Sequence, residues 1–175
     1  MDKLKINNTE IKIKRDDLTN MEVDAFVFYA KSDLSLGSGY GNAISTRGGP
    51  SIKAELEKLG SVKQTESIVS KAGNLNAKYI VHAVGPAFQE EDLVPKLKAT
   101  ISNALLEASK YEINTLAFPL MGIGFYGVPV DVSVKTMYDC VKEYATKNGK
   151  IKEIIFCAND NRELKLINDN IAKLN

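Results

Sequence analysis

The stretch Ala25-Phe26-Val27-Phe28-Tyr29 is the part of this 175-residue sequence that decides its fold. A short, continuous apolar run of this kind is typical of a strand covered on both faces, as in a parallel sheet flanked by helices. A glycine-rich stretch follows from Gly37 to Gly49, and Pro50 to Leu59 has the pattern of a short helix with proline in its first turn. This order of strand, glycine-rich segment and helix predicts an α/β protein.

The same alternation continues on both sides of this unit. Residues 4–13 alternate apolar and charged side chains around Asn7-Asn8, which predicts an edge hairpin or two short strands. Further buried strands are predicted at 67–70, 79–84, 115–118 and 154–157, and helical faces at 93–108, 134–141 and 164–174, with Asp92 as a cap. The sequence therefore predicts one domain, residues 1–175, with a mostly parallel sheet between helices.

Composition restricts the possible functions. Hydrophobic residues make up 44% and charged residues 26%, as in globular proteins, and 23 basic residues nearly balance 22 acidic ones, so no duplex nucleic acid partner is expected. No apolar run reaches the ~20 residues that span a bilayer, and no secretory signal follows Met1, so we expect a cytoplasmic protein. Cys140 and Cys157 are expected to be buried reduced thiols, and His82 is the single histidine. We expect a monomer without metal or cofactor.

Two glycine-dense segments follow predicted strands: Gly37 to Ile44 and Gly122 to Gly127. Glycine allows a positive φ and lets backbone amides approach phosphate oxygens without an intervening side chain. Neither segment is a Walker A sequence, and neither opens a first βα unit as a dinucleotide-binding fingerprint does. Because ligands bind beyond the carboxyl ends of strands in open α/β sheets, two converging phosphate-binding loops are favoured over two unrelated turns.

Five segments in this order resemble the macro domain family of ADP-ribose-binding modules, nearly from end to end. They are Asp16-Asp17-Leu18-Thr19, Val23 to Val27, Gly37 to Ile44, Tyr79 to Pro86, and Phe118 to Pro129. The resemblance implies a three-layer α/β/α sandwich with a mostly parallel mixed sheet. It also implies that the partner is ADP-ribose, free or attached to a protein.

The resemblance implies roles for particular residues. Asp17, with Leu18 beside it, would accept a hydrogen bond from the adenine amino group, and Asn159 stands where many members carry an aromatic ring that stacks on adenine. Gly39, Tyr40 and Gly41 would bind the diphosphate near the distal ribose. The second loop would close over the diphosphate from the other side with Gly122, Ile123, Gly124, Phe125 and Tyr126. Tyr126 would also pack on the distal ribose.

The sequence departs from the family's hydrolytic members at two positions. These members usually carry Asn-Ala-Ala-Asn where this chain has Phe28-Tyr29-Ala30-Lys31, so that Lys31 replaces the asparagine that orients the distal ribose. Many of them also carry an aspartate in the first loop, where this chain has Gly41. Lys31 is either a solvated lysine at the rim of the cleft, or a donor to ribose or phosphate, or a nucleophile; the catalytic residues are otherwise unassigned.

Three hypotheses follow for the function. The first is a module that binds ADP-ribose or an ADP-ribosyl group. The second is an ADP-ribosyl hydrolase or ADP-ribose 1″-phosphate phosphatase with an atypical active site, because the usual acid–base groups are absent. The third is a different small nucleotide on the same scaffold, which the altered residues 28–31 make possible.

Overall fold

Seven strands form one mixed sheet in the part of the chain that the computed structural model describes, residues 4–175. The first three residues of the predicted 1–175 domain lie outside this part. The strands are β1 (Leu4–Ile6), β2 (Thr9–Arg15), β3 (Ala25–Tyr29), β4 (Ser67–Lys71), β5 (Tyr79–Ala83), β6 (Thr115–Phe118) and β7 (Glu153–Ala158). Their order across the sheet is β1-β2-β7-β6-β3-β5-β4. The five central strands are parallel, and the edge strands β1 and β4 run antiparallel to their neighbours.

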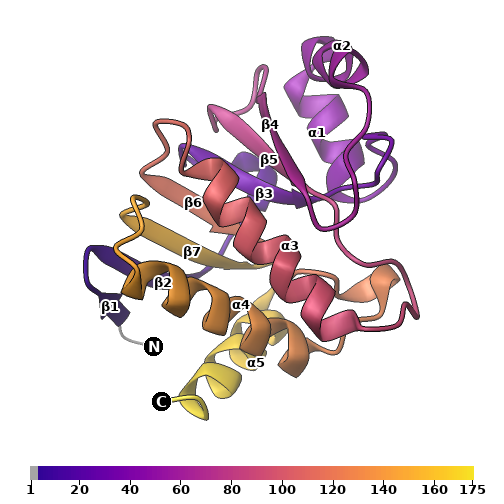
Figure 1. Cartoon of the computed structure of the whole chain (residues 1–175). Coiled ribbons are helices and arrows are strands. Elements are labelled where there is room, and N and C mark those ends of the chain that lie inside the picture. Colours follow the sequence, from indigo (N-terminus) through magenta and orange to yellow (C-terminus); the bar gives the residue numbers. More distant parts are fainter. Residues whose placement is uncertain (1–3) are drawn as a thin grey trace.

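Helices cover both faces of this sheet, as the sequence predicted. They are α1 (Tyr40–Gly48), α2 (Pro50–Leu59), α3 (Leu93–Ala108), α4 (Val130–Thr146) and α5 (Asn161–Ala172). Figure 1 shows α3 and α4 lying side by side across one face, with α5 next to α4, while α1 and α2 lie together near β3, β4 and β5. The predicted three-layer α/β/α sandwich is therefore confirmed.

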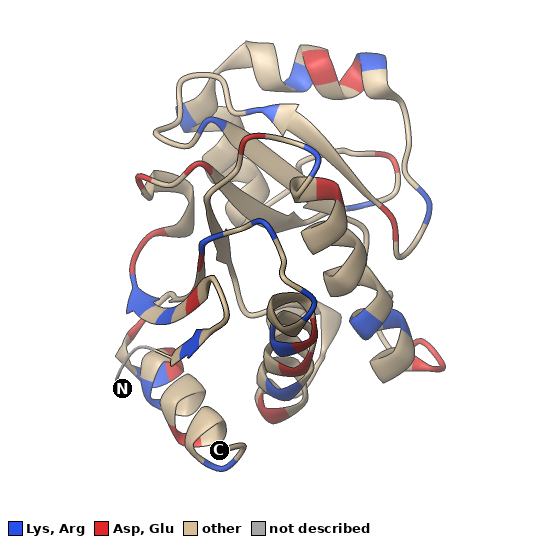
Figure 2. Ribbon diagram, turned by 60° about the vertical axis from the view of Figure 1, so that its left-hand side comes forward, with Lys and Arg blue, Asp and Glu red and all other residues tan. Residues whose placement is uncertain are grey.

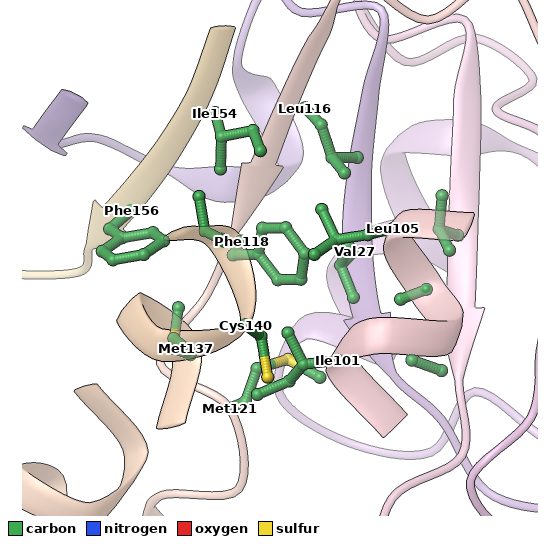
Figure 3. Close-up of a cluster of buried hydrophobic side chains, with 14 of the residues drawn as sticks. Val27, Ile101, Leu105, Leu116, Phe118, Met121, Met137, Cys140, Ile154 and Phe156 are labelled. Atoms are coloured by element: carbon green, nitrogen blue, oxygen red, sulfur yellow. The ribbon is translucent and has the colours of Figure 1, made fainter. Parts of the chain in front are cut away.

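The strands β3, β6 and β7 are nearly all apolar because their two faces belong to two different cores. Val27 and Phe118 pack on the side of α3 and α4, where Figure 3 shows them with Ile101 of α3. The next residue along β3, Phe28, points to the opposite side and packs with residues of α1 and α2. Burial on both faces leaves little room for polar side chains within these three strands, so chemistry is expected at their ends.

Two local predictions differ from the structure. The predicted first loop, Gly37 to Ile44, is a loop only as far as Gly39, because α1 begins at Tyr40 and buries Ile44 completely. Asp92 occupies the N-cap position of α3 as predicted, but its φ of 55° is left-handed and its side chain makes no capping hydrogen bond. The helix is instead fixed by the six residues that it buries.

Charges are spread over the surface, and the thiols are internal. Figure 2 shows basic and acidic segments interspersed along the chain, and several of them pair within helices, as Lys135 does with Asp139. Both cysteines are free and buried, as predicted, and burial raises the pKa of Cys157 to about 12. Within residues 4–175, no helix is both long and apolar enough to cross a membrane.

His82 is a core residue of β5. It is 1% exposed, and its Nε2 lies 2.8 Å from the Ser70 hydroxyl oxygen. Its Nδ1 is buried without a hydrogen-bond partner among the described residues. Burial lowers the pKa of His82 to about 4, because the charged imidazolium would lose its hydration.

This burial predicts a pH-dependent stability. The pKa of His82 is about 4 in the folded protein and about 6.5 in the unfolded chain, so between these values the unfolded chain binds more protons. We expect the free energy of unfolding to fall by about 2 kcal/mol from about pH 7 to about pH 5. His82→Gln, which keeps a hydrogen-bonding group beside Ser70, should flatten the curve in urea denaturation. An equally steep loss in the variant would contradict this assignment.

Candidate functional site

A cavity of about 480 Å³ lies beyond the carboxyl ends of β3 and β6. Three segments line it: the end of β3, the first glycine-rich loop and the second glycine-rich loop. The lining residues are Phe28, Tyr29, Lys31, Leu36, Ser38, Gly39, Tyr40, Pro119, Leu120, Gly122, Ile123, Phe125 and Tyr126. Lys31 is the one charged side chain in this lining. The two loops that the sequence predicted to converge do face the same cavity.

The first loop presents backbone donors at the start of a helix. Gly39 is the N-cap of α1, with φ 61° and ψ −128°, a conformation that is essentially restricted to glycine. Within residues 4–175, the amides of Ser38 and Gly39 donate no hydrogen bond. The N-terminus of α1 adds unsatisfied amides and the positive end of the helix dipole. This part of the cavity wall is suited to an anion.

Gly41 lies where its backbone has no space for a side chain. A Cβ atom built at Gly41 would lie 1.5 Å from the carbonyl oxygen of Leu36 and 2.4 Å from its carbonyl carbon. The amide of Gly41 donates to the carbonyl of Ser38 at 3.2 Å, and this hydrogen bond joins the first loop to the first turn of α1. A backbone carbonyl therefore fills the space in which an acidic side chain at this position would begin.

The second loop is a tight turn built on three left-handed glycines. Gly122, Gly124 and Gly127 have φ of 78°, 70° and 73°. Val128 donates its amide to Gly122 at 2.9 Å, whereas the amides of Ile123 and Gly124 have no acceptor in the described part of the chain. A Cβ at Gly124 would meet open space, and the Phe125 side chain is 83% exposed. This loop also offers amides to an anion.

Two tyrosine rings in tilted contact form part of the wall of the cavity. The rings of Tyr29 and Tyr126 lie 4.4 Å apart between centroids, and the Tyr29 hydroxyl donates to the carbonyl of Pro86 at 2.5 Å. A Cβ at Gly85 would come within 2.2 Å of the Tyr29 ring, so glycine is needed there. Burial is the main reason that the pKa of Tyr29 is raised. Sequence reasoning missed this role of Tyr29; the signal was Gly85, two residues beyond its β5 partner Ala83.

Lys31 is exposed and folds back over the start of the first loop. Its Nζ lies 3.3 Å from the position that a Cβ of Gly37 would take. Within residues 4–175, the ammonium group forms no salt bridge with any carboxylate, although its charge is a minor factor that lowers the pKa of Asp33. The carboxylate of Asp33 itself accepts hydrogen bonds from the amide and hydroxyl of Ser35.

Asp17 forms a separate polar group with Arg47 from the last turn of α1. Its Oδ1 accepts from the amide of Thr19 at 3.1 Å, and its Oδ2 accepts from Arg47. Partial burial opposes ionisation, but the hydrogen bonds from Arg47 and Thr19 outweigh it and lower the pKa of Asp17. Burial is the main reason that the pKa of Tyr40, in the cavity wall, is raised.

The structure brings together seven of the twelve predicted ligand residues around one cavity: Lys31, Gly39, Tyr40, Gly122, Ile123, Phe125 and Tyr126. Five do not line it. These five are Asp17, Leu18, Gly41, Gly124 and Asn159. Leu18 is fully buried. Asn159 is exposed, and its backbone amide donates a hydrogen bond to the Glu163 carboxylate. Within residues 4–175 no group of three or more His, Cys, Asp or Glu residues could hold a metal ion.

Comparison with known proteins identifies relatives over most of the chain. The family model described as "Macro domain" matches residues 29–137. A macro domain-containing protein of Caldanaerobacter subterraneus subsp. tengcongensis is 34% identical over 90% of this chain and 93% of its own length. A protein named as an ADP-ribose glycohydrolase in Xenopus laevis is 33% identical over 85% of this chain, which corresponds to 36% of that protein.

Solved structures share the fold at lower identity. A macrodomain of Oceanobacillus iheyensis, determined with ADP, superimposes with a TM-score of 0.91 at 20% identity, covering 98% of this chain and 95% of that one. A macrodomain of Trypanosoma brucei in complex with ADP-ribose gives a TM-score of 0.85 at 22% identity, with coverages of 92% and 68%.

The contact at Gly41 predicts a large effect of adding one methyl group. Gly41→Ala must displace the carbonyl of Leu36, and we expect it to lower the free energy of unfolding by about 1–3 kcal/mol. Asn42→Ala, at the exposed next position of α1, should change it by less than about 0.5 kcal/mol. Urea denaturation of both variants measures the difference. Equal free energies of unfolding for Gly41→Ala and Asn42→Ala would contradict this prediction, because they would mean that the Leu36 carbonyl moves away from position 41 without cost.

Proposed function

Because the chain belongs to the macro domain family, we propose that it binds ADP-ribose, free or attached to a protein, across the two glycine-rich loops. The observation that carries this proposal is the cavity between these loops, in which backbone amides and Lys31 face a space without any acidic side chain. We further propose that residues 1–175 act as one domain and that the protein works in the cytoplasm.

The diphosphate fits the chemistry of the loops. Ser38 and Gly39 offer free amides on one side of the cavity, and Ile123 does so on the other. Hydrogen bonds to a charged acceptor are roughly twice as strong as neutral ones, so a diphosphate held from two sides gains several such bonds. The left-handed glycines keep both walls free of side chains where the phosphates would approach.

The adenine would lie toward Asp17. A carboxylate has about four lone-pair sites, and the hydrogen bonds to Thr19 and Arg47 leave room for one more donor such as the adenine amino group. Asn159 offers no aromatic face there. Binding energy should therefore come mainly from the diphosphate end of the ligand.

Hydrolysis of ADP-ribosyl groups is the alternative function, and the relative named as a glycohydrolase favours it. The local structure favours binding instead. The carbonyl of Leu36 blocks any acid at position 41, and no carboxylate in residues 4–175 forms a salt bridge with Lys31, so none is held beside it to remove a proton from water. A protonated lysine cannot act as a general base.

The loops predict a specific ligand preference. We expect ADP-ribose to bind more tightly than AMP in calorimetric titration, and Gly124→Glu to abolish binding through repulsion between its carboxylate and the diphosphate. Gly60→Glu is the matched control, because Gly60 also has a positive φ and open space around its Cβ position but ends α2. Similar affinities for AMP and ADP-ribose, or equal losses in the two variants, would refute the placement of the diphosphate.

Turnover should be slow or absent. Positioned acid–base groups contribute about 10²–10⁴-fold to rate, and neither usual group is present here. We expect release of ADP-ribose from an automodified transferase to be at least ~10²-fold slower than with a macro domain that carries the full asparagine and aspartate set. Gly41→Asp should not restore it, because the Leu36 carbonyl occupies that space. Release at the control rate would establish the hydrolase alternative.

A further inference from the structure

Among residues 4–175, Lys31 is the one charged side chain that lines the cavity, and no carboxylate of this part of the chain forms a salt bridge with it. The nearest acid in sequence, Asp33, is exposed, bonded to Ser35 and absent from the cavity wall. The ammonium lies over Gly37, at the start of the same loop whose amides face the cavity. A single unpaired cation beside free amides is a site for an anionic group.

Few side chains in the lining of the cavity could orient a sugar. Phe28 has no hydrogen-bonding group, and the Tyr29 hydroxyl already donates to the carbonyl of Pro86. The Tyr126 ring lies in tilted contact with the Tyr29 ring. Apart from the hydroxyl-bearing residues Ser38, Tyr40 and Tyr126 and the backbone amides of the loops, the lining offers apolar and aromatic surface and one ammonium group. Its chemistry suits an anion better than the hydroxyls of a neutral ribose.

We propose that Lys31 forms an anion subsite next to the diphosphate site, so that the cavity prefers nucleotides with a third phosphate over nucleoside diphosphates. This inference rests on the proposed function for the position of the diphosphate. It adds a ligand class, the nucleoside triphosphates, which the ammonium of Lys31 recognises by charge. Lysine suits this role as a compact, strongly charged donor on a flexible stem that can follow a terminal phosphate.

The experiment is a calorimetric series with AMP, ADP, ATP and ADP-ribose in the presence of a metal chelator. We expect the wild-type protein to bind ATP roughly tenfold more tightly than ADP, as one charge-assisted hydrogen bond provides. Lys31→Gln should remove this gain, so that the variant binds ATP and ADP with similar affinity. Lys31→Arg should keep most of the gain. The gain should become smaller as the salt concentration rises, because salt screens the attraction between the cation and the phosphate.

The matched control is Lys142→Gln, an exposed lysine in the second half of α4 without a salt bridge among the described residues. It should leave all four affinities unchanged. Equal affinities of the wild-type protein for ADP and ATP would overturn the inference. It would also be overturned if Lys31→Gln lost affinity for ADP and ATP to the same extent, because the lysine would then contact the diphosphate. If the protein binds ADP-ribose but binds ATP no more tightly than ADP, this inference is overturned and the proposed function stands. If it binds ATP more tightly than ADP but does not bind ADP-ribose, the proposed function is overturned and this inference stands.

Discussion

Burial of β3 on both faces is the constraint on which the rest of the structure depends. Its neighbours β6 and β5 are hydrogen-bonded along its two edges, and its alternate side chains enter two separate cores. No polar side chain fits within such a strand without a partner. The functional groups therefore begin where the strand ends, at Tyr29 and Lys31, and the parallel arrangement brings the loop after β6 to the same edge.

The geometry beyond this edge is set by close backbone contacts rather than by polar side chains. The carbonyl of Leu36 occupies the space next to Gly41, and Tyr29 occupies the space next to Gly85. Each contact needs glycine, because a Cβ at either position would overlap its neighbour. Filling these spaces with a carbonyl and an aromatic ring fixes the loops in one arrangement, and it also removes room for other side chains. The conformation of the loops and the absence of space for an acidic side chain at position 41 thus have the same physical origin, which is close contact with the backbone.

The sequence predicted the sheet well because its signals are local. The apolar runs at 115–118 and 154–157 coincide with β6 and most of β7, since double burial requires such runs. The helix α1 and the conformation of Asp92 were not predicted, because a glycine-rich segment and a single capping residue do not determine local backbone angles. The contact between Tyr29 and Gly85 depends on the register between β3 and β5, which no local pattern contains. Because the register is not contained in local patterns, the sequence predicted the two loops but did not predict which of their residues line the same cavity.

The replacement at Lys31 has a different meaning in this structure than in the sequence alone. In the sequence, a lysine in place of an asparagine removes an orienting group, which reads as a loss of function. In the structure, the lysine lines the cavity without an acidic partner and lies against the first loop. A charge in such a place stabilises an anion more than a neutral amide would, because few competing charges surround it. The same substitution that weakens the case for hydrolysis therefore strengthens the case for binding a more highly charged nucleotide.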